Sequence, residues 1–186
     1  NNVKTHIDIK DRIGEFFSNG EGSYVEMPAN QYICYIDKLH WDMDRELLTL
    51  GNNDTNSIGS QFVSVHPKQD SLSFIAKNST YDLKDNIINV FGVDKLLVAD
   101  AIIYPSKGFL IEKDAFIPTI TEANILSNVS TRYHKFSNAT VNISDNNRYT
   151  ASGDYTYKDI LDNEQYIFFK EIFVDKEGNT VAISQV

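Results

Sequence analysis

The stretch that decides the fold is Leu72–Tyr104, which reads LSFIAKNSTYDLKDNIINVFGVDKLLVADAIIY. Short runs rich in β-branched and aromatic residues alternate in it with Asn, Asp and Gly, which favour turns. Ala76 is followed five residues later by Tyr81, and Ala99 is followed five residues later by Tyr104. The two pairs are offset by 23 residues, so the stretch predicts a sheet built of stacked rungs.

Short β-type runs also fill most of the remaining chain after residue 30. The last two runs, joined by Asp175–Gly178, are the best hairpin candidate because a short charged segment ending in Gly separates them. Short strands between turns predict an all-β fold with a rolled antiparallel sheet, either a β-jellyroll or solenoid-like. The predicted strands are 32–36, 46–50, 61–65, 71–76, 80–83, 87–93, 95–99, 101–104, 109–112, 123–126, 131–136, 139–143, 148–151, 153–158, 165–174 and 179–184.

The first residues have a different pattern. Ile9, Ile13, Phe16 and Phe17 fall at helical spacing and glycines follow, which indicates a short N-terminal helix or an ordered arm. Ile7 and Ile9 also alternate with polar residues, so a strand is the competing interpretation. The predicted organisation is an arm or helix over 1–22 and a single β-domain over 23–186.

Composition limits the classes of partner. The net charge of −9 argues against nonspecific binding to nucleic acid or to an anionic bilayer, because both need a basic patch. The single cysteine, Cys34, allows no internal disulfide and is expected to be a small buried side chain. No run approaches the ~18 apolar residues of a membrane helix. Asn1 and the lack of a visible signal peptide indicate a mature or trimmed piece.

The densest group of potential metal ligands is DKLHWDMD, with Asp37, His40, Asp42 and Asp44. On a strand, His40, Asp42 and Asp44 share one face, and such a group can bind a divalent cation. A polar turn with Trp41 pointing inward explains the same residues, so we expect no metal and no cofactor. Asn52, Asp54 and Asn56 begin like a calcium loop, but Ser57 stands where glycine is needed, which excludes an EF-hand.

Catalytic signatures are absent from the sequence. It has no G-x-S-x-G elbow and no phosphate-binding glycine loop, so we expect no enzyme activity. Five N-x-S/T sequons fit an exposed, extracytoplasmic surface, although an Asn- and Ser-rich β-protein produces them by chance. They begin at Asn53, Asn78, Asn128, Asn138 and Asn142.

Aromatic side chains are the remaining candidates for binding. Tyr81, Tyr104, Tyr133 and Trp41 are the candidate ligand-binding residues, in a groove or platform for lipid or sugar; Tyr155 and Tyr157 belong to the same set. Packing of these rings over the core, with their hydroxyls in water, is the alternative explanation.

Two segments, FIAKNSTYDLKDNIINVFGV (74–93) and LLVADAIIYPSKGFLIEKDA (96–115), carry a family resemblance. They resemble the rungs of the OstA-like family, the periplasmic lipopolysaccharide-transport bridge proteins. The residues concerned are Ala76, Tyr81, Asp82, Gly92, Val93, Ala99, Tyr104 and Pro105. The Asn/Asp/Lys/Tyr-rich style is also similar to that of large envelope proteins of Bacteroidetes-type bacteria. The resemblance implies an open-ended roll whose groove binds acyl chains and whose edges join neighbouring modules.

These expectations combine into two functional hypotheses. The first is a noncatalytic module of the periplasm or cell envelope that binds lipid, or stacks with adjacent β-modules through open strand edges in a transport or structural assembly. The alternative is a carbohydrate-binding or adhesin-like β-sandwich, with Trp41 in its platform. Neither hypothesis includes a nucleic-acid partner or a transmembrane segment.

Overall fold

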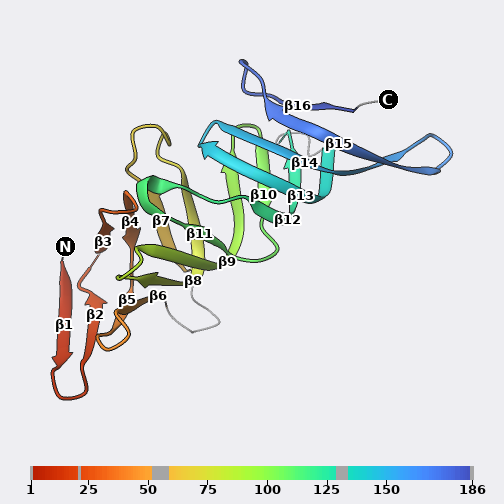
Figure 1. The fold of residues 1–186 in the computed structure, drawn as a ribbon. Coiled ribbons are helices and arrows are strands. Elements are labelled where there is room, and N and C mark those ends of the chain that lie inside the picture. Colours follow the sequence, from red (N-terminus) through yellow and green to blue (C-terminus); the bar gives the residue numbers. More distant parts are fainter. Residues whose placement is uncertain (1, 21, 52–58, 129–133, 185–186) are drawn as a thin grey trace. The chain divides into compact units, whose positions relative to one another are not determined.

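The computed structural model describes residues 2–20, 22–51, 59–128 and 134–184, and it confirms an all-β, antiparallel fold (Figure 1). Within these ranges the only helical element is the 3-10 turn η1 (Lys113–Ala115). No helix of the described part is long and apolar enough to span a membrane. The strands are β1 (Val3–Asp8), β2 (Ile13–Ser18), β3 (Tyr24–Met27), β4 (Tyr32–Tyr35), β5 (Lys38–Asp42), β6 (Leu47–Gly51), β7 (Ser60–Ser64), β8 (Ser73–Asp82), β9 (Ile87–Val98), β10 (Ala101–Tyr104), β11 (Phe109–Ile111), β12 (Ile120–Ser127), β13 (His134–Asp145), β14 (Arg148–Lys158), β15 (Glu164–Val174) and β16 (Thr180–Ile183).

The strands pair along one open path rather than closing into a roll. The main path runs β1-β2-β5-β6-β8-β9-β10-β12-β13-β14-β15-β16, and β3, β4, β7 and β11 branch from it. In this path β1 and β16 are the two end strands. The expected rolled sheet, jellyroll or solenoid-like, is therefore not formed as a closed structure, whereas the antiparallel sheet is confirmed.

The predicted N-terminal helix is wrong. β1 and β2 form an antiparallel hairpin in which Ile7 faces Gly14, and β2 pairs in turn with β5. At the turn, the Asp8 carboxylate accepts hydrogen bonds from the backbone N–H groups of Lys10 and Asp11, and Arg12 has a φ of 53°. The turn chemistry and the alternation of Ile7 and Ile9 therefore outweigh the helical spacing.

Several pairs of predicted strands are single long strands. β8 joins most of the runs 71–76 and 80–83, β9 joins 87–93 and most of 95–99, and β14 covers 148–151 and 153–158. Gly153 illustrates why: it looks like a strand break in sequence, but it lies at a register shift between β14 and β15. A side chain there would meet the Ala139 Cβ at 3.1 Å, so the glycine permits close approach of two strands.

The two copies of the sequence echo have different structures. Ala76 is fully buried within β8, whereas Ala99 lies in the β9–β10 turn with a φ of 52°. Tyr81 is 6% exposed and Tyr104 is 36% exposed. The echo is therefore not a repeat of equivalent rungs.

The chain forms two compact units that interleave along the sequence. Unit 1 contains residues 1–94 and 108–118, and unit 2 contains 95–107 and 119–186. Strand β9 contributes residues to both.

Unit 1 is built around the branch at β8. This strand pairs with β7 through residues 73–76 and with β6 through residues 78–82. Phe74 lies at the centre of the core, with ring centroids 5.3 Å from Phe62 and 5.1 Å from Phe109 of β11. Two buried side-chain amides connect segments that are distant in sequence. The Asn30 side chain donates to the carbonyls of Asn86 (2.7 Å) and Ile111 (3.0 Å), and the Gln69 side chain donates to the carbonyl of Ala115 (2.6 Å).

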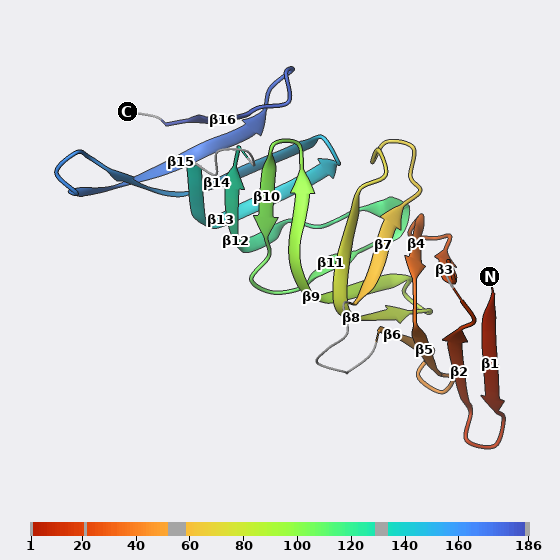
Figure 2. The same ribbon diagram turned by 180° about the vertical axis from the view of Figure 1, so that it is seen from behind.

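Unit 2 is a sheet of long strands (Figure 2). β13, β14 and β15 pair in sequence with register shifts between Ser137 and Thr140 and between Ala151 and Gly153. The Asp100 carboxylate, in the β9–β10 turn, accepts hydrogen bonds from the backbone N–H (3.0 Å) and hydroxyl of Thr180. This contact attaches the last strand, β16, to a turn that is 80 residues away in sequence. The hairpin predicted across Asp175–Gly178 is confirmed as β15–β16.

Candidate functional site

Trp41 lines an apolar cavity in unit 1. The cavity has a volume of about 440 Å³ and is formed by strands β1, β2, β3, β5 and β6. Trp41 faces Gly14 of β2 and Leu48 of β6 across the sheet. The lining consists of Val3, Phe16, Tyr24, Val25, Glu26, Leu39, Trp41 and Leu48. Glu26 is the only ionisable carboxylate among them, so the space suits an apolar group.

The indole N–H of Trp41 has no acceptor among the described residues, although it is buried. A buried donor without a partner is destabilising by about 1–3 kcal/mol. Gly14 allows this arrangement: a Cβ there would lie 3.3 Å from the Trp41 ring and 3.1 Å from Phe16. The cavity thus has mainly apolar walls.

Tyr81 is a core residue beside this cavity. It pairs with Leu48, which pairs with Trp41 on its other side, so the three side chains form one row across the sheet. Its hydroxyl donates to the Asn86 side-chain oxygen at 3.1 Å, and burial raises its pKa. Tyr81 therefore lies beside Leu48, which lines the cavity, and does not line the cavity itself.

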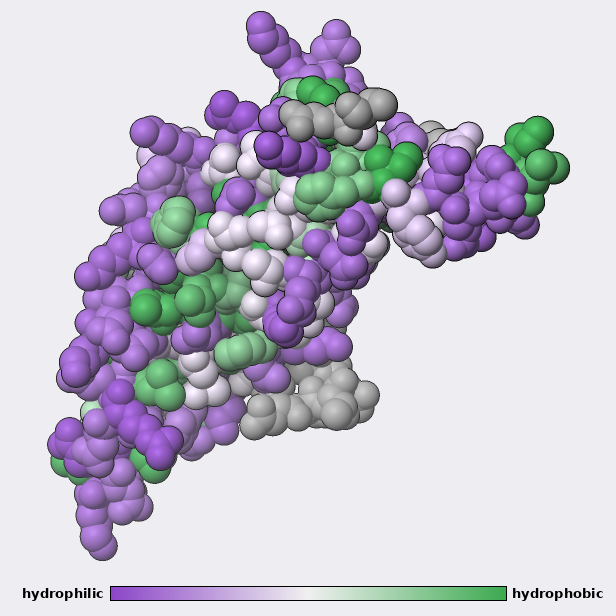
Figure 3. Space-filling model, turned by 45° about the vertical axis from the view of Figure 1, so that its right-hand side comes forward, coloured by the Kyte–Doolittle hydropathy of each residue, from purple (hydrophilic) through white to green (hydrophobic). Residues whose placement is uncertain are grey.

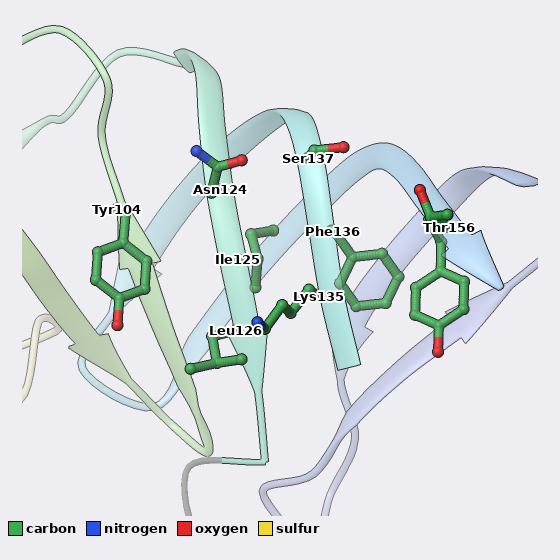
Figure 4. A pocket seen from close by; sticks show the side chains of 9 residues that line it. Tyr104, Asn124, Ile125, Leu126, Lys135, Phe136, Ser137 and Thr156 are labelled. Atoms are coloured by element: carbon green, nitrogen blue, oxygen red, sulfur yellow. The ribbon is translucent and has the colours of Figure 1, made fainter. Parts of the chain in front are cut away.

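Tyr104 lines a groove in unit 2 (Figure 4). The groove has a volume of about 610 Å³ and crosses β10, β12, β13 and β14. Leu126 and Lys135 lie opposite each other in the β12–β13 register. The remaining lining residues are Asn124, Ile125, Phe136, Ser137, Tyr155 and Thr156. The groove thus combines three aromatic rings and two aliphatic side chains with an amide, hydroxyls and one cation.

Tyr155 and Tyr157 line a second cavity of unit 2, about 570 Å³ in volume. Tyr155 belongs to an aromatic cluster, with ring centroids 5.5 Å from Phe136 and 5.9 Å from Phe169. His134 contributes as well, since its Nδ1 lies 3.2 Å from the Tyr155 hydroxyl. Sequence reasoning missed Phe136, Phe169 and His134, because only the strand register places them beside Tyr155.

The predicted site residues that the structure describes are distributed over both units. Trp41 and Tyr81 share a face of unit 1, and Tyr104 belongs to unit 2. Tyr133 lies outside the described residues.

The acidic cluster around His40 engages arginines. Asp44 pairs with Arg12, and Asp42 accepts a hydrogen bond from the Arg45 backbone N–H at 3.0 Å. β5 ends at Asp42, so Asp44 does not continue the strand face of His40. Among the described residues no group of three or more His, Cys, Asp and Glu could hold a metal ion, Asp37 included.

The other motifs lie on the surface or outside the description. Asn78 is exposed on β8, and Asn138 and Asn142 are exposed on β13. Asn53 and the stretch 52–58, with the rejected calcium loop, are outside the described residues.

Cys34 is fully buried, as expected, and burial raises the pKa of its thiol.

Comparison of the chain with protein-family models, with curated proteins and with solved structures gives no match.

Proposed function

We propose that this chain is a noncatalytic β-module of the bacterial periplasm or cell envelope that binds the acyl chain of a lipid and stacks with neighbouring domains. The lipid part is supported above all by one observation, the mainly apolar cavity of about 440 Å³ that Trp41 lines. The stacking part is supported by the open path of strands, which leaves edges for pairing. The resemblance of residues 74–93 and 96–115 to the rungs of the OstA-like family also belongs to this proposal.

An ester or amide of a fatty acid matches the cavity in unit 1. The acyl chain contacts Phe16, Leu39 and Leu48. Each buried methylene contributes about 0.8 kcal/mol.

The test uses Trp41, the only tryptophan of the chain, as its own reporter. Titration with a lysophospholipid below its micelle concentration is expected to shift the Trp41 emission and to saturate. Val25→Phe fills the cavity and is expected to weaken binding at least about tenfold, a change of about 1.4 kcal/mol. Val65→Phe is the matched control, since Val65 is 55% exposed. A protein that shows no saturable shift, and that carries no lipid after purification, does not bind lipid in this way.

The groove at Tyr104 favours a second candidate, carbohydrate binding. Aromatic rings beside amide and hydroxyl groups are suited to stacking on sugar rings and to bonding their hydroxyls. The expected result is binding on a glycan array that Tyr104→Ala abolishes. Unchanged binding in Trp41→Ala is then also expected, because Trp41 lies in the other unit. An array without hits removes this candidate.

A further inference from the structure

The β14–β15 hairpin leaves one strand edge without a partner among the described residues. β14 pairs with β15 from Lys158 opposite Glu164 onward. On the other side of β15, β16 pairs only with residues 171–174. The outer edge of Glu164–Lys170 therefore presents backbone N–H and C=O groups that can pair with another strand.

This edge segment has exposed aromatic side chains. Tyr166 is 77% exposed and Phe168 is 59% exposed, and the two lie on the same face of β15. The tip of the hairpin adds Ile160 and Leu161, which are 101% and 77% exposed. Figure 3 shows hydrophobic atoms at the end of this hairpin. An apolar strand edge without Pro, Gly or a central charge is a site of association.

The order of residues in the segment is self-complementary. Glu164-Gln-Tyr-Ile-Phe-Phe-Lys170 has opposite charges at its two ends and Ile167 at its centre. When two copies pair antiparallel about Ile167, Glu164 of each lies opposite Lys170 of the other. In the same register Tyr166 lies opposite Phe168, and Ile167 lies opposite Ile167. Charges of opposite sign and aromatic pairs are the favourable cross-strand neighbours in antiparallel sheets.

We propose that two copies of this chain form a symmetric dimer by pairing their β15 edges over residues 164–170, with Ile167 on the two-fold axis. The interface is isologous, as in most homodimers. Each dimer contains two Glu164–Lys170 pairs and two Tyr166–Phe168 pairs, besides the backbone hydrogen bonds. The inference rests on the stacking part of the proposed function, for which it names the partner and the register.

Cysteine cross-linking tests the register. Opposite residues in antiparallel strands have Cα atoms about 4.5–5.5 Å apart, which fits a disulfide. Ile167→Cys is therefore expected to give a covalent dimer under mild oxidation. Gln165→Cys is the matched control, because the two copies of residue 165 are four residues apart along the strand, about 13 Å. The native Cys34 is buried and does not interfere.

Charge exchange tests the pairing independently. Glu164→Lys and Lys170→Glu each place like charges opposite one another, and each is expected to weaken the dimer about tenfold, that is by about 1.4 kcal/mol. Lys170→Glu is the cleaner variant, because Glu164 also pairs with Lys158 of its own chain at 3.0 Å. Mixing the two variants restores both pairs, so a heterodimer is expected. Sedimentation of the parent protein is expected to show a concentration-dependent mass approaching twice the 21.1 kDa of one chain.

Two outcomes overturn the dimer. One is a constant monomer mass together with no cross-link in Ile167→Cys. The other is equal cross-linking of Ile167→Cys and Gln165→Cys. Neither outcome affects the Trp41 titration, so the loss of this inference is distinguishable from the loss of the lipid-binding proposal. A dimer that persists unchanged in both charge variants also contradicts the register.

Discussion

At the scale of single residues, the fold of unit 1 depends on Phe74. Its ring is 4% exposed and contacts Phe62, Phe109 and Tyr32, whose ring centroid lies 6.2 Å away. It therefore joins three strands that are distant in sequence. Removing it creates a cavity that the sheet cannot fill by collapse, because the surrounding backbone is held by strand pairing.

Phe74→Ala is expected to lower the free energy of unfolding by about 3–5 kcal/mol. The matched control is Phe91→Ala on β9, where the ring is 49% exposed and the expected loss is below about 1 kcal/mol. Urea denaturation followed by Trp41 emission measures both. Equal losses would show that Phe74 is not central to the core.

Tyr149 makes unit 2 sensitive to alkaline pH. Its hydroxyl forms a hydrogen bond with the Thr180 hydroxyl at 2.8 Å. Burial raises its pKa from 10.0 to about 12. Between these two values the folded protein keeps a proton that the unfolded chain has lost, so stability is complete below pH 10.0 and falls as the pH rises toward 12.

Tyr149→Phe is expected to reduce this alkaline loss of stability by about 1–3 kcal/mol, while costing about 1 kcal/mol at neutral pH through the lost hydrogen bond. Urea unfolding near pH 8 and near pH 11.5 gives the two values. Tyr104→Phe, on the exposed groove, serves as the control. An alkaline loss in Tyr149→Phe as large as in the parent protein would contradict the assignment.

At the scale of elements, Asp100 connects β16 to the β9–β10 turn through Thr180. β16 otherwise pairs with β15 alone. Its described contacts are thus this pairing, the Asp100 carboxylate and the hydrogen bond between the hydroxyls of Thr180 and Tyr149.

Asp100→Ala is expected to increase amide hydrogen exchange in Thr180–Ile183 at least about tenfold, since local opening depends on the few contacts that hold an end strand. Asp100→Asn keeps one acceptor oxygen and is expected to show a smaller increase. The β1–β2 hairpin, in the other unit, provides an internal reference. Unchanged exchange in both variants would mean that β15 pairing and the Tyr149 hydrogen bond hold β16 without Asp100.

Three elements, the hairpins β15–β16 and β1–β2 and the strand β3, show how much of the fold the sequence could predict. Asp175–Gly178 marks a hairpin because its turn chemistry is local, and the structure has that hairpin as β15–β16. The helix expected near Phe16 was wrong because Asp8 caps the turn of the β1–β2 hairpin. The Trp41 cavity depends on Val25 of β3, a strand that no local pattern predicted. The β1–β2 hairpin is decided by local turn chemistry, whereas the cavity is decided by pairing between distant strands, which no local pattern encodes.

At the scale of the whole molecule, net charge separates two modes of lipid binding. A chain with a net charge of −9 is repelled by an anionic bilayer. Uptake of a single acyl chain into a cavity does not depend on that surface charge.

Flotation with anionic phospholipid vesicles at low salt is therefore expected to leave the protein in the soluble fraction, while a lysophospholipid still shifts the Trp41 emission. Zwitterionic vesicles provide the comparison. Cofloating with anionic vesicles alone would indicate a basic surface and would contradict the charge argument.

The interleaving of the two units sets an order of events during synthesis. Asn30 and Gln69 leave the ribosome well before the carbonyls of Ile111 and Ala115 that they bind, at sequence separations of 81 and 46 residues. Residues 95–107, which belong to unit 2, are translated in between. The first unit is thus completed only after part of the second has been made. A nascent chain stopped at Lys107 carries two amide side chains that still lack these partners, so folding follows translation here with a delay of several dozen residues.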